Sequence, residues 1–184
     1  EMRVFVPTDA PVKIIRLRLR NRGHRSRRIT ATYYCEWLLG SLPSIARRHV
    51  RCEFDEGAQA IIATNPWNGE FAGRAAFLTA SGAVHGYTTD RDEFLGREHD
   101  DEHPAALRRW GLSGAQVAGP DACGACQLHI ELAAGEEIEA AFVLGEGASR
   151  EEALALAAHW RSLETINRAE DHLCDTWNRV LSAV

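Results

Sequence analysis

The sequence predicts a mainly β fold, an antiparallel β-sandwich followed by a helical segment. Short apolar runs of about strand length recur up to residue 148, glycines stand between or beside them, and a helical spacing of apolar residues begins only at Ser149. Since no helices alternate with the strands, the pattern does not favour βαβ units with a parallel sheet. We therefore expect a β-sandwich domain over residues 1–148 and helices over residues 149–184.

The first strand is expected over residues 13–20, KIIRLRLR, where apolar residues and arginines alternate and indicate one buried face. The next segment carries Asn21 and Gly23 and has the composition of a turn, and a β-branched and aromatic strand, ITATYYCEWLL, begins at Ile29. These two strands are predicted to form a hairpin with an arginine-rich outer face and tip.

Five later runs have the length of a strand: AQAIIAT, FAGRAAFLTA, VHGYTT, QLHIEL and IEAAFVLG. The pattern weakens between residues 92 and 120, where we expect a polar, irregular connection with a short helix over residues 104–110. This spacing is typical of an antiparallel sandwich.

A capping box marks the start of the helical segment, with Ser149 as the N-cap and Glu152 three residues later. Apolar residues at helical spacing then continue to Leu181, either as one long helix or as two helices broken near residues 161–165. Because Trp160 and Trp177 belong to the apolar side, this segment needs a surface to pack on.

Composition and charge exclude several classes of protein. Hydrophobic residues make up 45% and charged residues 26%, which are ordinary globular values. No run approaches the roughly 20 apolar residues that cross a bilayer, and no signal peptide pattern is present. Five cysteines with one close pair do not resemble a disulfide framework and favour a reducing compartment. The net charge of -5 argues against a general nucleic-acid binder, although the first third is strongly basic.

Cys123 and Cys126 are separated by two residues, a spacing that metal sites and thiol redox sites share. A structural zinc site needs two further ligands, whereas the other three cysteines are isolated in the sequence. A redox pair normally begins a helix, whereas this pair runs into the strand QLHIEL. We therefore expect two buried thiols without a metal, with Leu128, Ile130 and Leu132 facing the core.

Two charged segments have alternative interpretations. The segment HDDEH at residues 99–103 contains metal-ligating residue types, but neighbours in one loop rarely converge on one ion, so a solvated acidic loop is favoured. The basic segment could bind nucleic acid or phosphate groups, or could be a solvated face or a face docked on an acidic domain. Its arginines are Arg16, Arg18, Arg20, Arg22, Arg25, Arg27 and Arg28.

Two further segments could contact a sugar. Trp67 in NPWNGEF and Trp110 could stack on a sugar ring, although aromatic residues in such proteins also fill cores. TTDRDEFLGR combines charges of both signs with Phe94, a mixture that either fixes a loop or hydrogen-bonds a polyol. Spacing alone identifies no pair of catalytic carboxylates.

Several stretches in order, over residues 4–148, resemble one family. They are VFVPTDAPVKIIRLRLRNR, ATYYCEWLLG, TNPWNGEF, YTTDRDEFLGR, PAALRR with LSG, and ACQLHIELAAGEEIEAAFVLG. Together they resemble the β-sandwich domain before the catalytic barrel in the cellobiose and chitobiose phosphorylase family, most closely the version at the C-terminal end of cyclic β-1,2-glucan synthases. The helical tail is similar to the linker that leads towards the barrel, and related sequences carry an aliphatic residue in place of Cys126.

The resemblance implies a galactose-mutarotase-like super-sandwich that lacks its first strands, followed by a helical linker towards an (α/α)₆ barrel beyond Val184. The parent protein would be a glycosyltransferase or glycoside phosphorylase in which inorganic phosphate, as co-substrate, replaces water. Since the general acid and the phosphate site would lie in the barrel, we expect no catalytic residue, metal or cofactor in this chain, and no activity of this chain alone.

The expected function is therefore a non-catalytic, carbohydrate-associated part that supports the barrel and could bind β-glucan. The resemblance suggests sugar-contacting candidates in two loops: Asn65, Trp67, Asn68, Arg91, Glu93 and Arg97. An autonomous oligosaccharide-binding module and a nucleic-acid-binding module using the basic segment are the alternatives, and we expect no nucleic-acid partner. We expect a location at the cytoplasmic face, with membrane contact only through other parts of a parent that could be anchored in the inner membrane.

Overall fold

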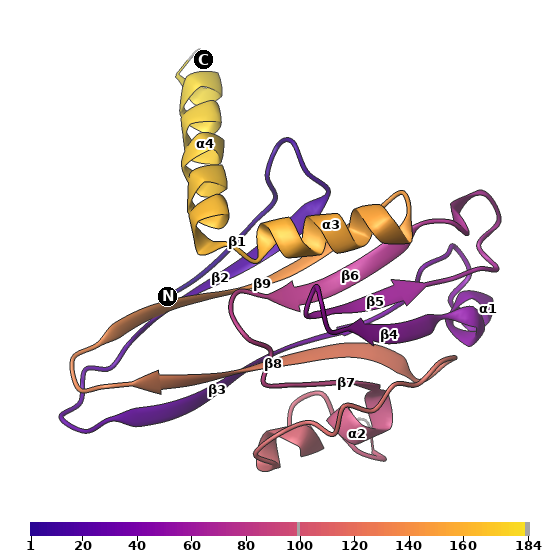
Figure 1. Cartoon of the computed structure of the whole chain (residues 1–184), viewed down its shortest axis with the longest axis horizontal. Helices are drawn as coiled ribbons and strands as arrows, with labels where there is room; N and C mark the ends of the chain where they lie inside the picture. The colour runs from indigo at the N-terminus through magenta and orange to yellow at the C-terminus, as the bar shows by residue number, and fades with distance from the viewer. Residues whose placement is uncertain (99, 183–184) are drawn as a thin grey trace.

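The computed structural model describes residues 1–98 and 100–182, in which two antiparallel sheets pack face to face (Figure 1). The strand order of the large sheet is β1 (Met2–Phe5), β2 (Val12–Arg20), β9 (Glu137–Gly147), β6 (Ala75–Ala80), β5 (Ala60–Thr64) and β4 (Arg51–Asp55). That of the small sheet is β3 (Arg27–Glu36), β8 (Ala122–Leu132) and β7 (Gly86–Asp90). The predicted mainly β, antiparallel sandwich is confirmed.

Helices lie outside the two sheets. The α-helices are α1 (Pro43–Ala46), α2 (Arg91–Leu95), α3 (Arg150–Trp160) and α4 (Leu163–Leu181), and the 3₁₀ turns are η1 (Arg47–His49), η2 (Gly69–Phe71) and η3 (Ala105–Arg108). Helix α3 lies across the large sheet, whereas α4 projects away from it (Figure 1). The short helix expected near residues 104–110 is present as η3. No helix in the described part of the chain is long and apolar enough to cross a membrane.

Burial on both faces explains the continuous apolar runs. The core between the sheets contains Leu78 and Phe142, and a second core between the large sheet and α3 contains Phe77 and Trp160. Adjacent residues of β6 thus point into different cores, because side chains alternate along a strand. A third cluster, which includes Phe94, joins the small sheet to α2 and η3.

The predicted hairpin of residues 13–39 is wrong, because β2 and β3 belong to different sheets. Their apolar sides face the same core from opposite sheets, and the Lys13 ammonium lies 5.8 Å from the centre of the Tyr33 ring. Face-to-face packing buries these side chains, which in-plane pairing would leave uncovered. Residues 21–26 therefore form an arch from one sheet to the other.

The helical segment consists of two helices, one of the two predicted arrangements. Ser149 Oγ accepts a hydrogen bond from the amide of Glu152 at 3.2 Å and begins α3 as predicted. Ser162 caps α4 in the same way, accepting from the amide of Thr165 at 3.3 Å. Between the helices, Arg161 Nε donates to the carbonyl of Ala80 at 3.1 Å, which fastens the break to the end of β6.

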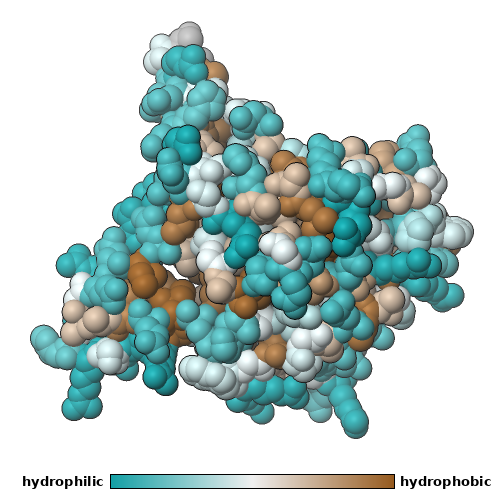
Figure 2. Space-filling view, viewed as in Figure 1, coloured by the Kyte–Doolittle hydropathy of each residue, from teal (hydrophilic) through white to brown (hydrophobic). Residues whose placement is uncertain are grey.

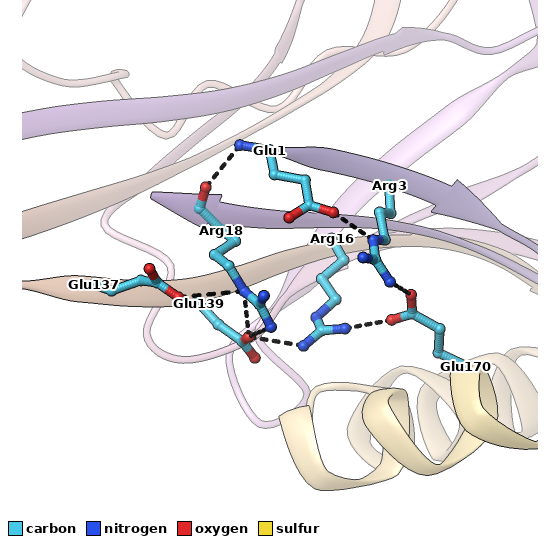
Figure 3. A network of polar contacts seen from close by, with 7 residues as sticks. All are labelled: Glu1, Arg3, Arg16, Arg18, Glu137, Glu139 and Glu170. Atoms are coloured by element: carbon cyan, nitrogen blue, oxygen red, sulfur yellow. Dashed lines mark hydrogen bonds and ion pairs between the residues drawn. The ribbon is translucent and has the colours of Figure 1, made fainter. Parts of the chain in front are cut away.

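An ion-pair network fixes the first half of α4 on the large sheet (Figure 3). Glu170 is only 7% exposed, and its carboxylate accepts hydrogen bonds from Arg16 and, at 2.7 Å, from Arg3. Arg16 also donates to Glu139 at 2.7 Å, and Arg18 donates to the same Glu139 oxygen at 2.8 Å. The arginines of β2 thus connect this strand to its neighbour β9 and to helix α4.

One side of the sandwich is open along β1 and β3. Met2 and Val4 alternate with residues that face α3 and α4, so they lie on the core side of β1, yet they are 66% and 54% exposed. Ile29, on the core side of β3, is 37% exposed. Figure 2 shows hydrophobic atoms at the surface where, in Figure 1, β2 and β9 separate from β3 and β8. The small sheet does not extend far enough to cover β1.

Candidate functional site

A cleft of about 460 Å³ opens at one end of the large sheet, where β5 and β9 end and β6 begins. Neighbouring antiparallel strands bring these chain segments together although they are far apart in sequence. The cleft is lined by Leu39, Gly40, Asn65, Asn68, Phe71, Arg74, Ala76 and Glu146. It combines an aromatic ring with amide groups and charged groups.

Asn65 organises the loop beside this cleft. Its side chain is buried and donates to the carbonyls of Leu39 at 2.8 Å and Ala46 at 3.2 Å, while its Oδ1 accepts from the amide of Trp67 at 3.0 Å. These bonds use both ends of the amide group. Asn65 therefore fixes the conformation of the loop. Asn68 is more exposed and is the asparagine that a ligand in the cleft would contact.

Two aromatic residues flank the loop differently. Phe71 belongs to the lining and is 50% exposed, whereas Trp67 lies outside the lining and is 60% exposed. The Trp67 ring stacks on His49, with 5.0 Å between ring centres and 13° between planes. On the cleft wall, Arg74 Nη2 lies 2.6 Å from Glu146 Oε1, and both side chains are partly exposed. Phe71 was not predicted although it ends the motif NPWNGEF. The ion pair was not predicted because its two residues are 72 positions apart in the sequence and meet only in the folded sheet.

The second predicted loop lies outside this cleft, and its polar residues hold the loop itself. Asp90 Oδ1 accepts from the amides of Asp92 and Glu93 and caps α2. Phe94 is buried and stacks on Tyr34, with 4.5 Å between ring centres. The charged residues of this loop therefore surround the short helix α2, and the stacked rings of Phe94 and Tyr34 attach this helix to the small sheet.

Arg91 and Glu93 each have partners within the domain. Arg91 Nη2 lies 2.6 Å from Asp121 Oδ1, and Glu93 accepts from the amide and hydroxyl of Ser113 at 2.8 and 2.7 Å. Burial alone would raise the pKa of Glu93, but hydrogen bonds from Thr88 and Ser113 outweigh it and hold the pKa below its usual range. Arg97 is exposed at the end of this loop. The structure brings Asn65 and Asn68 into one cleft and places Arg91, Glu93 and Arg97 elsewhere.

The two close cysteines lie on opposite faces of β8, because three residues along a strand reverse the side-chain direction. Cys126 faces the core between the sheets with Leu128, Ile130 and Leu132, as predicted. Both thiols are buried, and burial raises the pKa of Cys126 to about 12. One ion cannot be held between sulfur atoms that point in opposite directions.

His99 of the segment HDDEH lies outside the described residues. Within the rest of that segment, Asp100 Oδ1 accepts from the amides of Glu102 and His103 at 2.9 and 3.0 Å and closes a turn. Across residues 1–98 and 100–182, no group of three or more histidine, cysteine, aspartate or glutamate side chains could hold a metal ion.

Comparisons with known proteins agree on one family. The sequence model described as glycosyl hydrolase 94, supersandwich domain, matches residues 1–163. The chain is 32% identical, over 91% of its length, to the cyclic beta-(1,2)-glucan synthase NdvB of Rhizobium meliloti (strain 1021), of which it covers 7%. It is 30% identical, over 92% of its length, to the solabiose phosphorylase of Paenibacillus borealis, of which it covers 22%.

The N,N'-diacetylchitobiose phosphorylase of Vibrio furnissii is 24% identical over 95% of the chain, which covers 22% of that protein. Among solved structures, a polysaccharide lyase has a TM-score of 0.52 at 9% identity, over 87% of this chain and 21% of that one, a likeness of fold alone. The chain thus spans less than a quarter of these relatives. Its strand pattern, two-sheet architecture and family match agree, and the chain belongs to the glycosyl hydrolase 94 supersandwich domain family.

Proposed function

We propose that this domain is a non-catalytic support in an enzyme related to cyclic β-1,2-glucan synthases and glycoside phosphorylases, and that it packs against the catalytic domain of that enzyme. The relatives carry it as 7 to 22% of their length, so most of such a protein is available as a partner. The exposed apolar end of α4 is the observation that carries this proposal.

The two halves of α4 have different surroundings. The first half is docked through Ile166, which is fully buried, and through Glu170. In the second half Trp177, Val180 and Leu181 are 56%, 52% and 66% exposed. They continue the apolar stripe of the helix at spacings of three and four residues. Because the network around Glu170 fixes the direction of the helix, it presents this stripe in a defined position to a partner.

The open edge along β1 and β3 supports the same proposal. Strand β3 pairs only with β8 in the described chain, and Met2, Val4 and Ile29 expose apolar side chains on the core side. Additional strands of the parent protein would pair with β3 on the side away from β8 and cover these apolar side chains.

The test uses a longer protein that carries this domain together with its catalytic domain. Trp177→Glu should lower the catalytic domain's unfolding temperature by several degrees, because a charge on a buried apolar contact costs about 2–4 kcal/mol. The control is Asn178→Glu, which adds the same charge at the exposed neighbouring position. Equal unfolding temperatures for the two variants would contradict the packing of α4 on the catalytic domain.

A second function, binding of glucan oligosaccharides, is favoured by the cleft. Phe71 offers an exposed aromatic face, and Asn68, Arg74 and Glu146 offer hydrogen-bonding groups within the same lining. We expect titration calorimetry with β-1,2-linked glucose oligomers to give millimolar binding that Phe71→Ala abolishes. Leu107→Ala removes an apolar side chain that is 62% exposed outside the cleft and serves as control. A flat isotherm at millimolar oligosaccharide would count against binding.

A further inference from the structure

Five of the seven arginines of the basic segment fall into two groups. Arg16 and Arg18 are paired with Glu139, and Arg28 Nε lies 3.1 Å from Glu131. Arg20 and Arg22 are exposed at the arch between β2 and β3, and neither is ion-paired within the described chain. The first group has a structural role that the second group does not share.

The arch is held rigidly by Asn21, which is only 6% exposed. Its side-chain amide donates to the carbonyls of Arg25, Leu132 and Ala133 at 2.8, 3.2 and 2.9 Å, and its Oδ1 accepts from the amide of Gly23 at 3.0 Å. Its backbone also hydrogen-bonds Glu136 and Gly135. The arch and the turn between β8 and β9 therefore form one preorganised unit.

A groove of about 520 Å³ lies between the arch and this turn, lined by Arg20, Asn21, Arg22, Gly23, His24, Ala134 and Gly135. Its lining contains two guanidinium groups and an imidazole but no carboxylate among the described residues.

The nearby carboxylates are engaged elsewhere. Glu136 accepts from the amide of Ala133 at 2.6 Å, and Glu131 pairs with Arg28. Glu137 stands opposite Arg20 in the register of β2 and β9, but its carboxylate lies 3.5 Å from Arg18. No carboxylate of the described chain therefore lies within ion-pair distance of the Arg20 or Arg22 guanidinium group.

We propose that this groove binds a phosphoryl or sulfate group through Arg20 and Arg22, with His24 as an additional donor. The planar fork of a guanidinium group matches the oxygens of a tetrahedral dianion and can bond two of them at once. Because Asn21 already orders the backbone, binding has to immobilise only side chains. A single anionic group fits better than a polynucleotide, because the patch is short and the whole chain has a net charge of -5.

The test is a titration of the isotopically labelled chain with sodium phosphate and with sodium sulfate, followed by backbone amide chemical shifts. We expect saturable shifts confined to residues 20–24 and 133–136, a loss of affinity of about tenfold in Arg22→Gln, and no saturable shift in the double variant R20Q/R22Q. Arg48→Gln removes an exposed positive charge away from the groove and should change nothing. No saturable shift up to about 10 mM phosphate or sulfate, or the same shifts in the double variant, would overturn the proposal.

Two further ligands identify the source of the anionic group. Vesicles of phosphatidic acid in phosphatidylcholine, if they compete with phosphate for the same amides while pure phosphatidylcholine does not, would extend the site to lipid headgroups. A ten-nucleotide single strand should bind no more tightly per phosphate than the free ion. Tight binding of the oligonucleotide without any response to phosphate or sulfate would replace the proposal by a nucleic-acid interface.

Discussion

Replacing Glu170 by glutamine removes the charge that holds α4 on the large sheet. The carboxylate is almost fully buried and accepts from Arg3 and Arg16, so the substitution leaves Arg16, whose side chain is 12% exposed, with Glu139 as its remaining ion-pair partner. Removing one partner of a buried pair costs about 3–5 kcal/mol. Arg3 is half exposed and Arg16 keeps Glu139, so we expect a loss of about 2 kcal/mol here.

Hydrogen exchange of the α4 amides measures this loss directly. Since about 1.4 kcal/mol corresponds to a factor of ten, exchange over residues 166–173 should become about 30-fold faster in Glu170→Gln, while amides of β8 stay protected. Glu164→Gln is the control, because that side chain is 79% exposed and its ion-pair partner in the described part of the chain is Arg168 of the same helix. Unchanged protection of residues 166–173 in Glu170→Gln would refute the view that this network positions α4.

The same contact predicts a dependence on pH. Burial alone would raise the pKa of Glu170, but hydrogen bonds from Arg3 and Arg16 and their charges outweigh it and hold the pKa below 4.5. A carboxyl group with a lowered pKa in the folded state stabilises the fold above its unfolded pKa, and this contribution is lost as the pH falls through the folded value. Protection of α4 should therefore decline below about pH 4.5 in the wild type, and less in Glu170→Gln.

Three further predictions concern the thiols and one close backbone contact. Cys174 is exposed and should react with a thiol reagent within seconds at pH 7.5. The buried Cys123 and Cys126 should react only when the chain unfolds. Rapid reaction of all the thiols would contradict this arrangement. Addition of Co²⁺ should give no sulfur-to-metal charge-transfer band from Cys123 and Cys126, and a band lost in Cys126→Ser would show that they bind metal. Gly147→Ala would place a Cβ atom 2.5 Å from the amide nitrogen of Ala153. We expect the free energy of unfolding to fall by about 3 kcal/mol and the melting temperature to fall by about 10 °C. In the control Gly73→Ala the nearest atom to the new Cβ lies 3.9 Å away, so the stability should hardly change.

Local sequence patterns predicted the positions of strands and helices better than they predicted which strands pair with each other. Alternation identified β2, and Ser149 with Glu152 identified the start of α3, because both signals lie within a few neighbouring residues. Whether β2 turns back in its own sheet or crosses to the other depends on which apolar faces meet, and neighbouring residues do not encode that. Strand β4 and the helices α1 and α2 were not predicted.

The candidate site shows the same division. The resemblance to a known family singled out Asn65, Trp67 and Asn68, and the structure places the two asparagines in a cleft. The cleft also needs Glu146, which comes from the end of β9, far along the chain. Likewise Arg16 meets Glu170 across 154 positions of sequence, so no local spacing could have revealed the pair.

Incubation of the purified 184-residue chain with linear β-1,2-glucan and inorganic phosphate tests the central claim most directly. The claim is that this domain supports catalysis carried out elsewhere in the parent protein. A family member that contains its catalytic domain serves as the positive control, and release of sugar phosphate is measured over hours. We predict no sugar phosphate above the level of a phosphate-free blank. Steady, phosphate-dependent release that scales with the concentration of this chain would contradict the claim.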